Sequence, residues 1–213
     1  MIITRTEQIY IEPNDIISNL CHTAKNLYNE ALYPMRQAYF HNIKNPNEPK
    51  QIPTYNNLAG TFKKSENFKK LPAQTAQSVL KVLDRSWKSY WEAIKDYKLN
   101  PGKYKGKPKP PNYRNKDGEF LLIFTNQSCN INSYENLMMW NAGNNKTIKY
   151  IDVRYKSNIK DINNKYKTNV DSDNYLLFPN ISGIKPIKTR LPKNIDLREV
   201  RIIPQGVGYN VEI

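Results

Sequence analysis

The sequence predicts an α+β fold, a small β-barrel with a helical bundle inserted after the first strand. Three features of the 213-residue chain predict it. Residues 2–11 alternate loosely between apolar and polar side chains, as a strand does; helical patterns then continue to about residue 100, and short strand-like runs follow. A lone N-terminal strand needs partners. We therefore expect it to pair with the later strands, which makes the helices an insertion.

Two helices are expected early in the insertion. Pro13-Asn14-Asp15 opens a pattern of apolar residues spaced by three and four, at Ile16, Ile17, Leu20, Ala24, Leu27 and Ala31. Pro34 should kink or end this helix, with a continuation through Tyr39, because proline lacks the N–H of the helical ladder. Three prolines make residues 43–53 a loop, and a shorter helix should run from about Thr54 to Phe62.

The clearest element is a long helix that starts at Leu71-Pro72, with proline in its first turn. Its apolar stripe is wide enough to face a core and consists of Ala76, Leu80, Leu83, Trp87, Tyr90, Trp91, Ile94 and Tyr97. On the opposite side, five polar residues fall within about 80° of each other, namely Gln77, Lys81, Arg85, Lys88 and Lys95. This polar face is either a solvated surface or a binding surface.

A basic segment follows the long helix. Residues 98–116 hold seven basic residues and no acidic one, together with four prolines, two glycines and two tyrosines. Because proline removes backbone donors, the segment is expected to be neither helix nor central strand. We assign residues 101–117 as a basic Pro/Lys-rich loop.

Beyond the loop we expect strands at 119–124, about 147–155, 175–178, 184–190, 197–203 and 207–213. The last two should form a hairpin around a glycine-containing turn. The expected organisation is a first barrel strand at 1–12, an inserted helical recognition domain at 13–100, the loop at 101–117, and the remainder of the barrel at 118–213.

The charge points to a polyanionic partner. The chain has a formal net charge of +14, and residues 61–120 hold 15 basic against 6 acidic residues. Nucleic acid is the partner that this charge favours, with an acidic membrane surface as the weaker alternative. No apolar run approaches the roughly 20 residues of a membrane span, and the N-terminus lacks a secretory apolar core. We therefore expect an unprocessed cytoplasmic protein.

Combined with the basic loop, the helix face favours nucleic-acid binding. Glutamine can pair with an adenine edge and arginine or lysine with guanine, so a face with Gln77 and Arg85 could read a short sequence. In the loop, the residues expected to contact phosphate or RNA are Lys103, Tyr104, Lys105, Lys107, Lys109, Tyr113 and Arg114. The two tyrosines could stack on bases or pack the loop against the protein, and the sequence leaves both alternatives open.

The residues show no catalytic site. The phosphate-loop, dinucleotide and zinc-protease motifs are missing, and Asp171 and Asp173 are best explained as a solvated turn. Two cysteines, Cys21 and Cys129, are too few for a disulfide framework or a thiolate zinc site and are expected to be buried. No metal ligands are assigned.

Six sequence blocks together resemble the N-terminal part of TnpB, the OrfB-type protein of certain insertion sequences. They cover nearly all of the chain except about 130–170 and are YNEALYPMRQ (28–37), LPAQTAQSVLKVLDRSWKSYW (71–91), GKPKPPNYR (106–114), FTNQ (124–127), LLFPNISGIKPIKTRLP (176–192) and LREVRIIPQGVGYNVEI (197–213). The resemblance implies an RNA-guided DNA nuclease related to type V CRISPR effectors. In that family a wedge-like β-barrel, interrupted by a helical recognition domain, precedes a RuvC-like nuclease domain.

The resemblance also implies the partners, a guide RNA held by the wedge and double-stranded DNA read at a short motif beside the target. The family's motif-reading positions carry over to Tyr55, Gln74, Gln77, Ser78, Lys81, Thr125 and Asn126, and the helix face adds Arg85 and Lys88. The RuvC carboxylates, which imply magnesium, and the zinc ribbon match nothing in this sequence. We therefore expect a fragment or a natural truncation that does not cut DNA by itself. The alternatives are a stand-alone DNA-binding regulator and a decayed transposon remnant.

Overall fold

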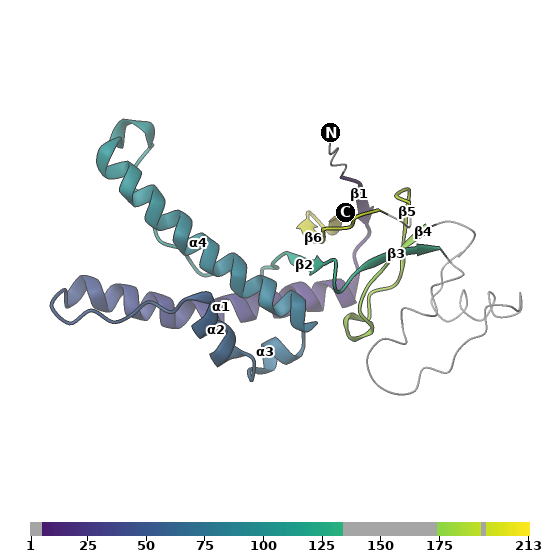
Figure 1. The fold of residues 1–213 in the computed structure, drawn as a ribbon, viewed down its shortest axis with the longest axis horizontal. Coiled ribbons are helices and arrows are strands. Elements are labelled where there is room, and N and C mark those ends of the chain that lie inside the picture. The colour runs from purple at the N-terminus through teal and green to yellow at the C-terminus, as the bar shows by residue number, and fades with distance from the viewer. Residues whose placement is uncertain (1–5, 134–173, 193–194) are drawn as a thin grey trace, which may run out of the picture. The chain divides into compact units, whose positions relative to one another are not determined.

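A computed structural model describes residues 6–133, 174–192 and 195–213 and confirms the α+β class (Figure 1). The chain divides into two compact units. One, here called the sheet unit, comprises Met1–Ile17 and Ile123–Ile213; the other, the helical unit, comprises Ser18–Leu122. The helical unit is thus a single stretch of chain set between two stretches of the sheet unit.

The helical unit contains two long helices and several short ones. Helix α1 spans Asp15–Lys44 and begins just before the unit does, and α4 spans Ala73–Leu99. Between them lie α2 (Tyr55–Phe62) and the single turn α3 (Glu66–Lys69), and the 3-10 turn η1 (Pro101–Lys103) follows α4. The expected helices at 54–62 and from Pro72 are confirmed, with Thr54 and Pro72 as the preceding caps. The sequence did not predict α3 or η1.

Helix α1 continues through Pro34 as one element, so the expected continuation through Tyr39 is confirmed and the alternative that the helix ends at this proline is excluded. Proline removes one backbone hydrogen bond of the helix, but the residues on both sides are anchored in the core. Leu32 and Met35 are essentially inaccessible to solvent. Burial of such side chains, about 1.5–3 kcal/mol each, is of the same order as the cost of the proline.

The core of the helical unit lies between α1 and α4. The predicted stripe of α4 is buried from Ala76 through Leu80, Leu83 and Trp87 to Tyr90, whereas its last members are half-buried. Aromatic rings join the two helices, since the ring of Tyr39 on α1 lies 5.4 Å from that of Trp87. The stripe is therefore a core face along most of α4.

The sheet unit holds two small sheets. The first has the order β1-β7-β6-β2, with β1 at Gln8–Ile11, β7 at Gly208–Glu212, β6 at Glu199–Gln205 and β2 at Leu122–Thr125. The second has the order β3-β4-β5, with β3 at Asn130–Ser133, β4 at Asn174–Leu177 and β5 at Ile187–Thr189. The N-terminal strand pairs antiparallel with the C-terminal one, Gln8 opposite Glu212. The lone first strand thus finds the late partner that the sequence required.

The described strands do not close into a barrel, in contrast to the expected architecture. Several strands are also shorter than expected or displaced: β1 starts at Gln8, β2 runs to Thr125, and β5 covers only Ile187–Thr189. Strand β3 was not predicted. The expected strand at 147–155 lies outside the described residues.

The expected hairpin at the end of the chain is confirmed. Strands β6 and β7 pair antiparallel, with Gln205 opposite Gly208. The turn needs a residue with positive φ, which glycine adopts without steric cost, and Gly206 supplies it with φ +61°. The hairpin therefore has its register set by the turn.

Glu7 connects the two sheets. Its backbone exchanges hydrogen bonds with Ile213, at 3.2 and 2.9 Å, while its carboxylate accepts from the Thr189 hydroxyl and from the Arg190 backbone N–H at 3.2 Å. The side chain of Arg190 adds an ion pair at 3.2 Å. Burial alone would raise the pKa of Glu7, but these hydrogen bonds and the nearby guanidinium lower it below its usual value.

Candidate nucleic-acid interface

The polar face of α4 is exposed where it carries charge. Lys81, Arg85 and Lys88 are exposed, whereas Gln74 and Gln77 are half-buried. Ser78 is buried, and its hydroxyl donates to the Gln74 carbonyl at 2.9 Å. In this structure the Ser78 hydroxyl is used within the helix, so the surface is formed by the two glutamines and the basic residues.

Asp84 brings Tyr55 to this face. Its carboxylate accepts a hydrogen bond from the backbone N–H of Tyr55 at 3.0 Å and pairs with Lys88 at 2.7 Å. The first N–H groups of a helix have no intrahelical partner, and a carboxylate there also suits the helix dipole. Lys81 Nζ lies 5.6 Å from the centre of the Tyr55 ring. The start of α2 is thus held against α4, with three predicted DNA-binding residues, Tyr55, Lys81 and Lys88, in one cluster.

Thr125 and Asn126 belong to the sheet unit, at the end of β2. The carbonyl of Thr125 accepts hydrogen bonds from the N–H groups of Ser128 and Cys129, at 2.8 and 3.0 Å, in a tight turn. Asn126 is exposed, and its N–H donates to the Arg198 carbonyl at 3.2 Å. The turn therefore presents Asn126 to solvent. The predicted DNA-binding residues accordingly fall in two groups, one in each compact unit.

The basic loop is fastened along α1 by three polar side chains. Lys25 donates to the Lys116 carbonyl, and Arg36 donates to the Pro111 carbonyl at 2.6 Å. Asn29 makes two bonds to the backbone of Arg114, donating to its carbonyl at 2.9 Å and accepting from its N–H at 2.8 Å. These bonds fix the course of a proline-rich segment that has no ladder of its own. We call Lys25, Asn29 and Arg36 the α1 clamp.

The beginning of the loop folds back onto the end of α4. The Tyr104 hydroxyl donates to Asp96 at 2.7 Å, Lys103 pairs with the same carboxylate at 3.4 Å, and the Tyr104 ring meets Tyr97 edge-on at 5.7 Å. The hydrogen bond to Asp96 raises the pKa of Tyr104, whereas the bonds from Tyr104 and Asn100 lower the pKa of Asp96. Of the two alternatives for Tyr104, the structure shows the packed one.

Further along the loop, three exposed lysines are followed by Tyr113 and Arg114, each of which takes part in a contact between a cation and an aromatic ring. Lys105, Lys107 and Lys109 are exposed. Tyr113 is 41% exposed, with the Arg36 guanidinium 5.3 Å from its ring centre. Arg114 stacks 5.1 Å from the centre of Phe120 and 5.3 Å from that of Tyr28. Arg114 therefore contacts the core aromatics, and Tyr113 remains partly exposed to solvent.

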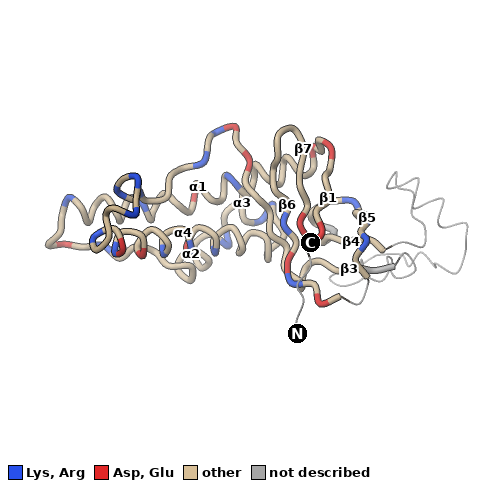
Figure 2. Tube along the Cα trace, turned by 90° about the horizontal axis from the view of Figure 1, so that it is seen from above, with Lys and Arg blue, Asp and Glu red and all other residues tan. Residues whose placement is uncertain are grey.

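Ion pairing separates the cations of α4 and of the loop as far as Lys109 into two sets. Asp84, Glu92 and Asp96 pair with Lys88, Lys95 and Lys103. No acidic side chain in the described part of the chain lies within ion-pair distance of the second set, which consists of Lys81, Arg85, Lys98, Lys105, Lys107 and Lys109. Figure 2 shows lysines and arginines along α4 and the turn after it. These six cations form the uncompensated part of the surface.

The α1 clamp could not be predicted from the sequence. Its residues lie four and seven positions apart along α1, a spacing that places them on one side of a helix. The signal was present as polar residues at helical spacing beside the apolar pattern. Nothing local, however, identified their partners, which are backbone groups 75 to 91 residues away.

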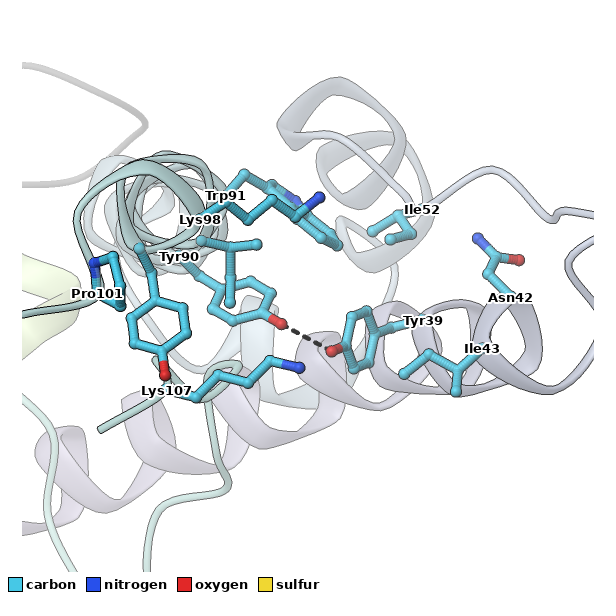
Figure 3. Close-up of a pocket in the computed structure, with 11 residues that line it drawn as sticks. Tyr39, Asn42, Ile43, Ile52, Tyr90, Trp91, Lys98, Pro101 and Lys107 are labelled. Atoms are coloured by element: carbon cyan, nitrogen blue, oxygen red, sulfur yellow. Dashed lines mark hydrogen bonds between the residues drawn. The ribbon is translucent and has the colours of Figure 1, made fainter. Parts of the chain in front are cut away.

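An aromatic pocket was also missed, because the sequence pattern assigned its residues to the core. It has a volume of about 770 Å³ and opens between the ends of α1 and α4 and the loop (Figure 3). The hydroxyls of Tyr39 and Tyr90 share a hydrogen bond of 2.7 Å. Burial, followed by this bond, raises the pKa of Tyr90. Trp91, whose ring lies 4.9 Å from that of Tyr90, and Tyr97 are half-buried and also line the pocket.

The described residues contain no cluster of three or more histidine, cysteine, aspartate or glutamate side chains suited to a metal ion. Both cysteines are free and buried as expected, and burial raises the pKa of each thiol. Among the helices described, none is long and apolar enough to cross a membrane. The sequence matches no protein-family model, and no curated protein matches it.

Proposed function

We propose that this chain is the nucleic-acid-recognition part of a TnpB-like RNA-guided DNA nuclease. In this role the basic loop binds guide RNA, and α4, with Tyr55 beside it, binds a short motif in double-stranded DNA. The observation that carries the proposal is the set of six uncompensated cations on α4 and on the loop that the α1 clamp holds in place.

Fixing the loop matters for affinity. A free lysine-rich chain loses conformational entropy when a polyanion orders it. Here the backbone near Pro111 and Arg114 is already bonded to Arg36 and Asn29, so less ordering is needed on binding. The exposed lysines can then meet phosphates from defined positions.

The two kinds of residue on α4 suit two kinds of contact. Lys81 and Arg85 are exposed and can neutralise phosphates or reach guanine. Gln77 is half-buried on the same face and can pair with an adenine edge in the major groove. Asn126 of the sheet unit is proposed as a further contact, together with the Thr125 backbone beside it.

The sheet unit is proposed to be the wedge. Its first and last strands pair, Ile9 opposite Val211, as required when a barrel is interrupted by an inserted domain.

A salt titration of the whole chain tests the proposal. If the six uncompensated cations contact phosphates, the slope of log K against log salt should be about −4 to −5 for a structured RNA. Replacing Lys105, Lys107 and Lys109 with alanine should reduce the steepness of that slope by about 2–3 and weaken binding to all sequences. The matched control replaces Lys63, Lys64 and Lys69, which are exposed and outside the proposed interface. Affinity that ignored salt, or equal losses in both triple variants, would contradict the proposal.

A further inference from the structure

The aromatic pocket lies at the C-terminal end of α4, beyond Lys81 and Arg85 of the polar face. Trp91 follows Lys81 by ten residues, which is roughly 15 Å along a helix. The pocket has a volume of about 770 Å³, which lies within the range of about 300–1,000 Å³ that is usual for small-molecule sites. The pocket is therefore large enough for a small ligand, and the chemistry of the side chains that line it indicates which kind of ligand.

The walls offer flat aromatic surfaces. Tyr39, Tyr90, Trp91 and Tyr97 all line the pocket, and Trp91 and Tyr97 keep part of their surface in solvent. Rings of this kind stack on any nucleobase, because every base has a π-face. A fully packed core would have left no space beside them.

The hydroxyl pair of Tyr39 and Tyr90 adds a polar contact. When one hydroxyl donates to the other, the acceptor keeps its own proton to donate, and the donor keeps a lone pair to accept. The pair can thus offer one donor and one acceptor to a polar group of a ligand. Figure 3 shows the two hydroxyls pointing toward one another from α1 and α4.

The charge at the pocket selects an anion. Lys98 and Lys107 line it, and the amine of Lys107 points toward the hydroxyl pair (Figure 3). No acidic residue is among the lining residues. An aromatic cage for a quaternary ammonium ion is disfavoured, because two ammonium groups would repel the ligand. A flat ring joined to a phosphate could stack on the aromatic walls and pair its negative charge with the two lysines.

We propose that this pocket holds a single unpaired nucleotide, with its base against Trp91 and Tyr97 and its phosphate on Lys98 and Lys107. The proposal rests on the proposed function, since the nucleotide is taken to be one that is unpaired within a bound RNA. A free mononucleotide presents the same chemistry and is tested separately.

The test uses the full chain and three probes. The first is an RNA duplex with one bulged 2-aminopurine, the second is the same duplex fully paired, and the third is adenosine monophosphate. The expected result is quenching of the bulged base on binding, since stacking on an indole quenches its emission. The bulged duplex should also bind more tightly than the paired one.

Two variants locate the effect. Trp91→Ala should weaken binding of the bulged duplex about tenfold and leave the paired duplex nearly unchanged, as expected for the loss of one base stack. Because Trp91 also packs in the core, Lys98→Ala with Lys107→Ala gives a second measurement at exposed positions. This double variant should weaken binding of the bulged duplex more than binding of the paired duplex. The control, Lys105→Ala with Lys109→Ala, removes the same charge from interface residues that do not line the pocket and should weaken binding of both duplexes equally.

The outcomes separate the two proposals. If the chain binds both duplexes equally and without quenching, the pocket assignment fails while the proposed function stands. If it binds neither duplex but binds the mononucleotide through Trp91, the proposed function fails and the pocket takes a free nucleotide. An acidic, tyrosine-containing peptide that displaced the bulged base at equal affinity would overturn the nucleotide assignment.

Discussion

Glu7 is a single buried carboxylate held by Thr189 at the end of β5 and by Arg190 directly after it. Its side chain is 7% exposed, and it takes hydrogen bonds from Thr189 and Arg190. A buried charge is tolerated only when it is paired and hydrogen-bonded. Glu7 is therefore a point at which pH acts on stability.

We predict that Glu7→Gln lowers the free energy of unfolding by about 1–3 kcal/mol at neutral pH. The folded state lowers the pKa of Glu7 below its usual 4.5, so the stabilisation is complete above about pH 4.5 and is lost as the pH falls through the lower folded value. Urea unfolding at pH 7 and at pH 3 measures this, and the difference between the two proteins should shrink at acid pH. Glu199→Gln, at a surface ion pair, is the control and should cost less than about 0.5 kcal/mol. A difference that persisted at pH 3 would contradict the role of the charge.

Gln77 is the residue on α4 with the clearest capacity to read a base. We predict that Gln77→Ala reduces discrimination among short DNA motifs by about 1–3 kcal/mol and leaves non-specific binding nearly unchanged. Competition binding with a library of short duplexes measures this. Gln37→Ala, at an exposed position of α1, is the matched control. Unchanged discrimination would remove the assignment of base reading to Gln77.

At the scale of elements, the α1 clamp is a small set of bonds that controls a long segment. We predict that Asn29→Ala speeds amide exchange across residues 104–116, because both bonds to the Arg114 backbone disappear. Affinity for RNA should fall by a few-fold, since a looser loop has more entropy to lose on binding. Hydrogen exchange followed by mass spectrometry measures the first effect, and filter binding the second. Asn19→Ala, an exposed asparagine on the same helix, should change neither, and unaltered exchange in Asn29→Ala would show that the loop is held by other contacts.

The helices and strands also show how much of the secondary structure could be predicted from the sequence. Helix α4 could be predicted almost to the residue, because its apolar period and its start signal agree. Helix α1 could be predicted through Tyr39, but the sequence left open whether Pro34 would end it, and packing of Leu32 and Met35 explains why it does not. Strand β3 has no pattern strong enough to reveal it, since its pairing with β4 joins residues more than 40 positions apart.

The candidate interface divides in the same way. That Lys81 and Arg85 lie on one exposed side of α4 could be predicted from helical geometry. The pairing of Lys88 and Lys103 with Asp84 and Asp96, and the burial of Ser78, depend on side-chain packing that spacing does not encode. The pocket was hidden because an aromatic residue at the end of an apolar stripe has the same pattern whether it is buried or open.

At the scale of the whole molecule, the helical unit is a continuous stretch with its own core. We predict that residues 13–122 expressed alone keep their helices and unfold in one cooperative thermal transition, because the buried faces of α1 and α4 are both present. The fragment should also bind structured RNA with a steep salt slope, since it contains all six uncompensated cations. Circular dichroism and a salt titration measure these properties. A broad, non-cooperative melt would show that the unit depends on the sheets and would favour the decayed-remnant alternative.

The pairing of β1 with β7 has a mechanical consequence. The strands run antiparallel with Gln8 opposite Glu212, so the two ends of the described chain leave the ladder side by side. Tension between these ends loads the cross-strand hydrogen bonds one after another, because they lie perpendicular to the strands. The hydrogen bonds between β1 and β7 should therefore break one at a time, at low force. The inserted helices should carry no load until these two strands have separated.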